Sequence, residues 1–154
     1  MKGVPIALAA ILGAGLMAPL ASASEPRTEV QVAQADGTPV VWERWVSRHA
    51  PVVLLVWASW APRAADALTK IDELRAACRA HGLQLTVVDV QEPRGDAQAV
   101  LSSAAAGWLH DRHGSILKRY RVIRVPSLIV LDKAGDAVAR LEATPAAIAG
   151  WNPH

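Results

Sequence analysis

The chain has 154 residues, of which 52% are hydrophobic and 19% charged, and its formal net charge is +2. These values exclude a disordered or low-complexity chain, and the small net charge argues against a protein held to nucleic acid by phosphate contacts. Cys78 is the only cysteine, which excludes an intramolecular disulfide, a cysteine-based zinc cluster and any two-thiol reaction within one chain.

The first 23 residues have the pattern of a secretory signal peptide. Lys2 precedes an apolar run, Val4–Leu20, and Ala21–Ala23 then supplies the small-x-small sequence that signal peptidase accepts. An uncleaved membrane anchor is the alternative, because the run approaches the length of a short span, and contact with a membrane is expected in that case alone. We expect cleavage after Ala23, which leaves residues 24–154 as a single domain in the periplasm.

The remaining chain alternates strand-like and helix-like stretches. A continuous β-branched and apolar run predicts a strand buried on both faces at Val52–Trp57, and apolar residues three and four apart predict one helix over Pro62–His81. Further strands are predicted at Thr28–Gln34, Val40–Trp42, Leu83–Val90, Trp108–Leu109, Ser127–Leu131 and Ala137–Leu141, and further helices at Asp96–Ala106, Ser115–Tyr120 and Thr144–Trp151. Strand-helix-strand units early and a hairpin late favour an α/β fold with a mixed sheet and helices on both faces.

A motif stands where the first buried strand turns into the long helix. Trp57–Ala64, with the sequence W-A-S-W-A-P-R-A, resembles the active-site segment of thioredoxin-like proteins, in particular the exported TlpA/ResA-type disulfide oxidoreductases, where it usually reads W-A-[ST]-W-C-x-x-C. The resemblance extends in register over about residues 28–142, through Asp36–Val40, Val87–Val90, Gln91–Leu109, Tyr120–Ser127 and Asp132–Gly135. It implies a thioredoxin-like three-layer α/β/α sandwich with a mixed central sheet.

This sequence departs from the family at the reacting positions. The two cysteines of the family are replaced by Ala61 and Ala64. In the family, the first thiol is stabilised as a thiolate at a helix N-terminus and attacks a substrate disulfide, and the second thiol resolves the mixed disulfide. Alanine supplies no nucleophile, so we expect no catalytic residue and no dithiol reaction at this site.

The resemblance also implies a binding groove. Val125-Pro126 matches the cis-proline loop of the family, whose preceding backbone pairs with an extended peptide of the partner. We therefore expect Trp60, Pro62, Arg63, Val125 and Pro126 to form a groove for a protein partner, with Trp57 in the core. Arg119, Arg121 and Arg124 form a basic cluster close to this groove.

Cys78 and the pair His110 and His113 are two further candidate sites. Cys78 lies on the apolar stripe of the predicted helix, roughly 25 Å from position 61 along a continuous helix, and is expected to be a small core residue rather than a reacting thiol. His110 and His113 flank Asp111 in a turn, a set that suits copper or zinc, but we favour a solvated turn and predict neither a metal nor another cofactor.

Three functions remain open at this point. We favour a non-catalytic, protein-binding or accessory module of periplasmic redox or cytochrome-type maturation, which is what the resemblance and the missing dithiol together imply. The first alternative is a thiol-disulfide oxidoreductase that acts through Cys78 or through the thiols of a partner. The second is a metal-handling accessory protein that uses His110 and His113.

Overall fold

The computed structural model describes residues 28–153, so the predicted signal peptide lies outside the described residues. Its strands are β1 (Gln31–Gln34), β2 (Pro39–Val41), β3 (Val52–Trp57), β4 (Gln84–Val90), β5 (Leu109–Asp111), β6 (Ser127–Leu131) and β7 (Ala137–Glu142). Its helices are α1 (Trp42–His49), α2 (Ala64–Thr69), α3 (Ile71–Ala80), α4 (Arg94–Ala104), α5 (Ser115–Tyr120) and α6 (Pro145–Ala149).

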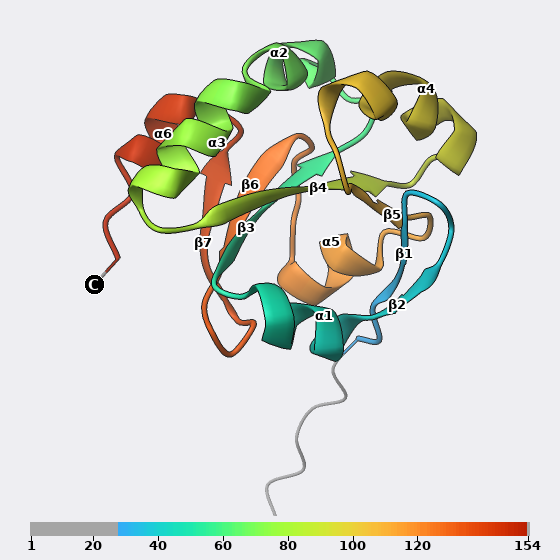
Figure 1. Cartoon of the computed structure of the whole chain (residues 1–154), viewed down its shortest axis with the longest axis horizontal. Coiled ribbons are helices and arrows are strands. Elements are labelled where there is room, and N and C mark those ends of the chain that lie inside the picture. The colour runs from blue at the N-terminus through green and yellow to red at the C-terminus, as the bar shows by residue number, and fades with distance from the viewer. Residues whose placement is uncertain (1–27, 154) are drawn as a thin grey trace, which may run out of the picture.

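The strands form one mixed sheet in the order β2-β1-β5-β4-β3-β6-β7 (Figure 1). β3, β4 and β5 run parallel to one another, and β6, β7, β1 and β2 join antiparallel. β3 occupies the interior of the sheet, and all six of its side chains are buried. This burial on both faces explains its unbroken apolar sequence.

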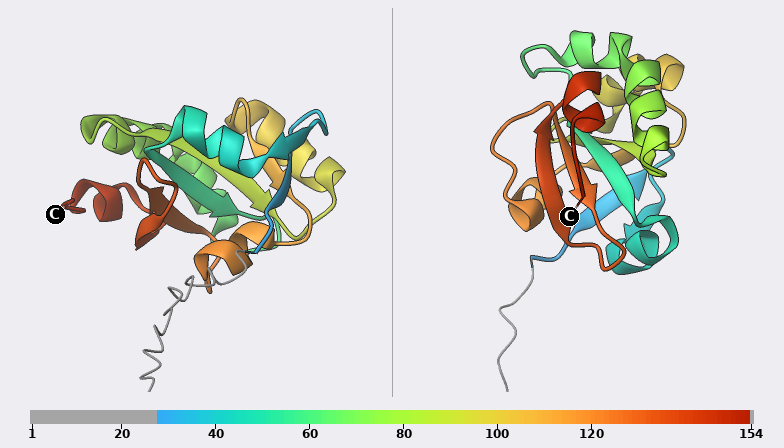
Figure 2. Two further views of the ribbon diagram at one scale, coloured as in Figure 1. Left: turned by 90° about the horizontal axis from the view of Figure 1, so that it is seen from below. Right: turned by 90° about the vertical axis from the view of Figure 1, so that its left-hand side faces the viewer.

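Helices cover both faces of the sheet (Figures 1 and 2). α3 and α6 pack together on one face, where Leu74, Cys78 and Ile148 are fully buried. α1 and α5 pack on the other face, where the indole Nε1 of Trp42 donates a hydrogen bond of 2.9 Å to the hydroxyl of Tyr120. The expected three-layer α/β/α sandwich is confirmed.

The long helix predicted after β3 was wrong in part. The helix expected over Pro62–His81 is two helices that meet at Lys70, where the backbone leaves the helical region at φ −102° and ψ 12°. The Thr69 hydroxyl donates to the carbonyl of Asp66, a local bond that competes with continuation of the helix. Arg63, at φ +64°, also delays the start of α2 to Ala64.

The N-terminal hairpin is shorter than predicted. β1 begins at Gln31 rather than Thr28, and β2 ends at Val41, because Trp42 begins a helix that the sequence interpretation did not include. In α1, Trp42 and Val46 are one turn apart and buried, while the polar residues between them face outward. The described residues contain no helix that combines the length and the apolar character needed to cross a membrane.

Candidate functional site

The segment Trp57–Ala64, whose sequence resembles the active-site segment of thioredoxin-like proteins, lies at the carboxyl end of β3. Ala61 and Ala64 are 6% and 5% exposed, and their main-chain N–H groups donate to the carbonyls of Ala58 and Ala61 in consecutive turns. Trp57 is buried in the core as predicted, and its indole Nε1 donates to the carbonyl of Ala64 at 2.9 Å. The backbone of the segment is therefore held by hydrogen bonds, and the side chains at positions 61 and 64 are methyl groups.

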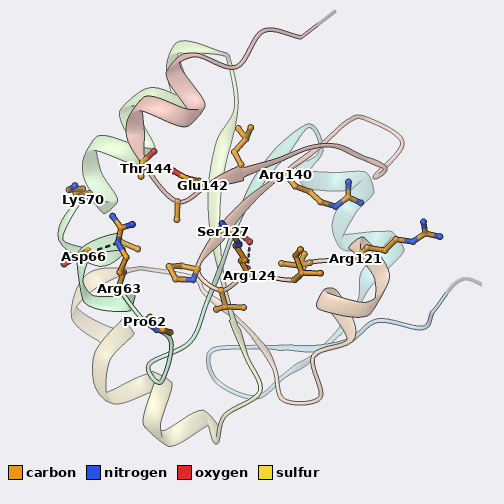
Figure 3. A pocket seen from close by; sticks show the side chains of 17 residues that line it. Pro62, Arg63, Asp66, Lys70, Arg121, Arg124, Ser127, Arg140, Glu142 and Thr144 are labelled. Carbon is orange, nitrogen blue, oxygen red and sulfur yellow. Dashed lines mark hydrogen bonds and ion pairs between the residues drawn. The ribbon is translucent and has the colours of Figure 1, made fainter.

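A groove runs beside this segment (Figure 3). It has a volume of about 690 Å³, and we call it the cis-proline groove; its walls come from the loop before α2 with α2 itself, from the loop between α5 and β6, and from the end of β7 (Pro62, Arg63, Asp66, Ala67, Lys70, Arg121–Ser127 and Arg140–Thr144). The Val125-Pro126 bond is cis, as the resemblance implied. Of the five expected groove residues, Pro62, Arg63, Val125 and Pro126 lie together here.

Trp60 does not line the groove. Its side chain is 55% exposed on the loop between β3 and α2, so it is available for contact but lies outside the groove walls. Among the described residues, the main-chain N–H and C=O of Val125 have no hydrogen-bond partner, and the pairing of β6 with β3 begins at Ser127. A free donor and acceptor next to Pro126 are what an added strand requires.

A buried acidic side chain fixes the loop within the segment Trp57–Ala64. Glu92 follows β4, is 6% exposed, and accepts hydrogen bonds from the main-chain N–H of Ser59 at 2.7 Å and from the Ser59 hydroxyl. Burial alone would raise the pKa of Glu92, but its hydrogen bonds with Asp89 and Ser59 lower that pKa below its usual value. Ser59 is thus a partner of a carboxylate rather than an activated nucleophile.

Asp89 and His110 form a buried pair behind this loop. The strands β4 and β5 place them side by side, and the His110 Nδ1 lies 2.7 Å from the Asp89 Oδ2. Burial and then the nearby Glu92 raise the pKa of Asp89 to about 9, and burial lowers the pKa of His110. Among residues 28–153, no hydrogen-bond partner faces the Asp89 Oδ1.

Cys78 lies in the core, as expected. It is fully buried on α3, and this burial raises the pKa of its thiol to about 11. A thiol that is both inaccessible and protonated is a poor nucleophile, because the thiolate is the reacting form. The location and the ionisation of Cys78 both argue against thiol exchange through this residue.

The structure separates the two histidines of the metal-handling alternative. His110 is buried against Asp89, whereas His113 is exposed. Both oxygens of Asp111 are occupied by the start of α5, since they accept from the N–H and hydroxyl of Ser115 and from the N–H of Ile116. In the part of the chain that the structure describes, no three His, Cys, Asp or Glu side chains converge for a metal ion.

Comparison with solved structures supports the fold. Neither the family models nor the curated proteins give a match. Among solved structures, a putative thiol:disulfide interchange protein DsbE from Chlorobium tepidum is 22% identical, with a TM-score of 0.58 over 74% of this chain and 80% of that one. The exposed lipoprotein thioredoxin Etrx1 of Streptococcus pneumoniae is 20% identical, with a TM-score of 0.57 over 77% and 93%.

A secreted disulfide oxidoreductase of Mycobacterium tuberculosis, homologous to E. coli DsbE, gives a TM-score of 0.54 at 20% identity, over 77% of this chain and 87% of that one. The chain therefore has the thioredoxin-like fold of DsbE-type disulfide oxidoreductases. Ala61 and Ala64 carry no sulfur atom, so neither side chain can take part in thiol-disulfide exchange.

Proposed function

We propose that this protein is a non-catalytic thioredoxin-fold module that binds a partner polypeptide in the cis-proline groove. The observation that carries the proposal is the combination of an open groove of about 690 Å³ with alanine at both dithiol positions. The groove keeps the parts that bind an extended chain, namely cis-Pro126 and the free main-chain groups of Val125. The groups that it lacks are the two thiols of the exchange reaction, because positions 61 and 64 are alanine.

A peptide-binding measurement tests this proposal. Backbone amide resonances of the ¹⁵N-labelled protein are followed while an extended eight-residue peptide of alternating polar and valine residues is added. We expect the shifts to concentrate at residues 62–70, 121–127 and 140–144, around the groove walls. Shifts that centre elsewhere, or no shift at millimolar peptide, would contradict the proposal.

A groove-blocking variant supplies the control. Thr144 lies on the groove wall, is half-buried, and its hydroxyl caps α6 by accepting from the N–H of Ala147. Ser127 lies on the wall without capping a helix, so Ser127→Trp fills the groove while leaving α6 unchanged. We expect Ser127→Trp to weaken peptide binding at least ten-fold, while Ser47→Trp, on the exposed face of α1, leaves binding unchanged.

We further propose that the protein acts outside the cytoplasm as an accessory of periplasmic redox or cytochrome-type maturation, after removal of residues 1–23. The small-x-small sequence Ala21–Ala23 supports export, and two solved relatives of the same fold are described as an exposed lipoprotein and a secreted protein. The mass of the protein from a periplasmic fraction should correspond to a chain that begins at Ser24. An intact N-terminus in the membrane fraction would favour the anchor instead.

A further inference from the structure

The walls of the cis-proline groove carry an excess of positive charge. Arg63 and Lys70 lie on one side and Arg121 and Arg140 on the other, with Arg124 between them (Figure 3). Against these five cations the walls hold two carboxylates, those of Asp66 and Glu142. The excess is local, because the whole chain has a formal net charge of only +2.

Part of this charge is free to meet a ligand. Two of the arginines already have partners. The Nε of Arg63 lies 3.8 Å from the Oδ2 of Asp66, and the Nε of Arg140 donates to the carbonyl of Tyr120 at 2.5 Å. Lys70, Arg121 and Arg124 are exposed and form no ion pair with another residue in 28–153. Three unpaired cations around one concave surface favour an anionic occupant.

An apolar side chain stands among these cations. Ile123 is 94% exposed and lies in the loop between Arg121 and Arg124, on the wall of the groove. An isoleucine that is almost fully exposed gains free energy when a partner covers it. The occupant therefore needs an apolar side chain close to its anionic groups.

We propose that the cis-proline groove selects an extended acidic segment of a partner protein, in which carboxylate side chains alternate with apolar ones. This inference rests on the proposed function and names the chemical class of its partner. Side chains two residues apart in an extended strand share one face and stand about 7 Å apart, so the carboxylates of such a segment follow one another along one face while its main chain pairs with Val125. Lys70, Arg121 and Arg124 are the cations of the groove walls that are free to bind these carboxylates. Charge-assisted hydrogen bonds from arginine to carboxylate are the stronger kind and set the preference.

The test compares three labelled eight-residue peptides by fluorescence anisotropy at low salt. The first alternates glutamate with valine, the second replaces every glutamate by glutamine, and the third replaces every glutamate by lysine. We expect the glutamate peptide to bind at least ten-fold more tightly than the glutamine peptide, and its affinity to fall as salt is added. We expect the lysine peptide to bind most weakly.

The variants separate local charge from net charge. Arg121→Gln with Arg124→Gln should reduce the advantage of the glutamate peptide by about ten-fold. Arg79→Gln with Lys133→Gln removes the same charge from exposed positions outside the groove and should change nothing. Far-ultraviolet circular dichroism of both double variants checks that they are folded.

The outcomes distinguish this inference from the function on which it rests. Equal affinity for the glutamate and glutamine peptides overturns the acidic preference but leaves the groove as a peptide site. Absence of binding for all three peptides overturns both. Sedimentation with vesicles of phosphatidylglycerol that depends on Arg121 and Arg124, without preference for the glutamate peptide, would assign the cations to a lipid surface and overturn the inference.

Discussion

At the residue scale, side-chain hydrogen bonds of Trp57 and Glu92 hold the segment that contains Ala61 and Ala64. Trp57 holds the start of α2 through the carbonyl of Ala64, and Glu92 holds the loop through both the N–H and the hydroxyl of Ser59. Arg63 adopts a left-handed backbone at φ +64° within the same loop. Such a conformation costs on the order of 1 kcal/mol for a residue other than glycine, so the surrounding contacts must hold it.

The thiol of Cys78 should be inert in the folded protein. It is buried on α3, and its pKa of about 11 keeps it protonated at pH 8. We expect 5,5′-dithiobis(2-nitrobenzoate) to label less than a tenth of the native protein in an hour, and to label one thiol per chain at once in urea. Rapid stoichiometric labelling of the native protein would contradict the buried location.

Asp89 should make stability depend on pH. Its pKa of about 9 in the folded state lies above the ordinary value of 3.8, so at pH 7 the folded protein keeps a proton that the unfolded chain releases. By linkage, its contribution to the free energy of unfolding is greatest below about pH 4 and is lost as pH rises toward 9. Asp89→Asn removes this titration, so we expect its stability relative to the wild type to be higher at pH 8.5 than at pH 5.5 by at least ~1 kcal/mol in urea unfolding.

Asp111 is the matched control for that measurement. Its carboxylate accepts three hydrogen bonds from the first residues of α5, whereas Asp89 has an oxygen that no donor in residues 28–153 faces. Asp111→Asn should therefore lose about 1–3 kcal/mol at both pH values, because one of its oxygens becomes a donor that faces other donors. If Asp89→Asn behaves in the same way, Asp89 is ionised in the folded protein and its assignment here is wrong.

At the scale of elements, one hydroxyl joins α1, α5 and the hairpin between β6 and β7. The Tyr120 hydroxyl accepts from the Trp42 indole at 2.9 Å and donates to the carbonyl of Gly135 at 3.2 Å. Tyr120→Phe leaves both of these groups without this partner in a buried place, so we expect a loss of about 1–3 kcal/mol in urea unfolding. Ser47→Ala, which removes an exposed hydroxyl on α1, should stay within about 0.5 kcal/mol, and an equal effect of the two would contradict the role of Tyr120.

The sequence predicts the buried strands better than the surface helices. β3 and β6 were predicted with the bounds that the structure has, because a strand covered on both faces must be apolar throughout. α1 was missed although Trp42, Trp45 and Val46 have the i, i+3, i+4 spacing of one helix face, because Trp42 was assigned to the preceding strand. The break at Lys70 depends on local backbone bonds that the apolar stripe does not report.

The candidate site was predicted in the same uneven way. Pro62, Arg63, Val125 and Pro126 came from motifs that the chain carries as contiguous sequence, and they meet in the groove. Glu92 was missed, since nothing in its neighbourhood indicates that it reaches a loop 33 residues earlier. Asp89 does have a signal in the sequence, because a carboxyl group between valines in the buried half of a strand requires a partner or a proton.

At the scale of the whole molecule, the fold assembles the groove from three distant parts of the chain. β6 pairs with both β3 and β7. This pairing brings the loop before α2, the loop before β6 and the end of β7 together at one end of the three strands. The groove therefore depends on the intact domain, and none of its lining residues carries a sulfur atom.

Introducing two thiols tests whether this scaffold supports disulfide exchange. Ala61→Cys with Ala64→Cys places two thiols at the positions that resemble the cysteines of the family, just before and at the start of α2. We expect this double variant to reduce insulin disulfides at least ten-fold faster than the wild type in the presence of dithiothreitol. A folded but inert double variant would mean that the groove no longer accepts a disulfide-bearing chain.

Insulin reduction by the wild-type protein tests the central claim most directly. With dithiothreitol as the electron source, the rate of insulin precipitation is measured with and without the wild-type protein, and with Cys78→Ser. The account predicts that all three rates are equal, because Ala61 and Ala64 have no sulfur and Cys78 is buried with a raised pKa. A wild-type rate above that of dithiothreitol alone, abolished in Cys78→Ser, would contradict it.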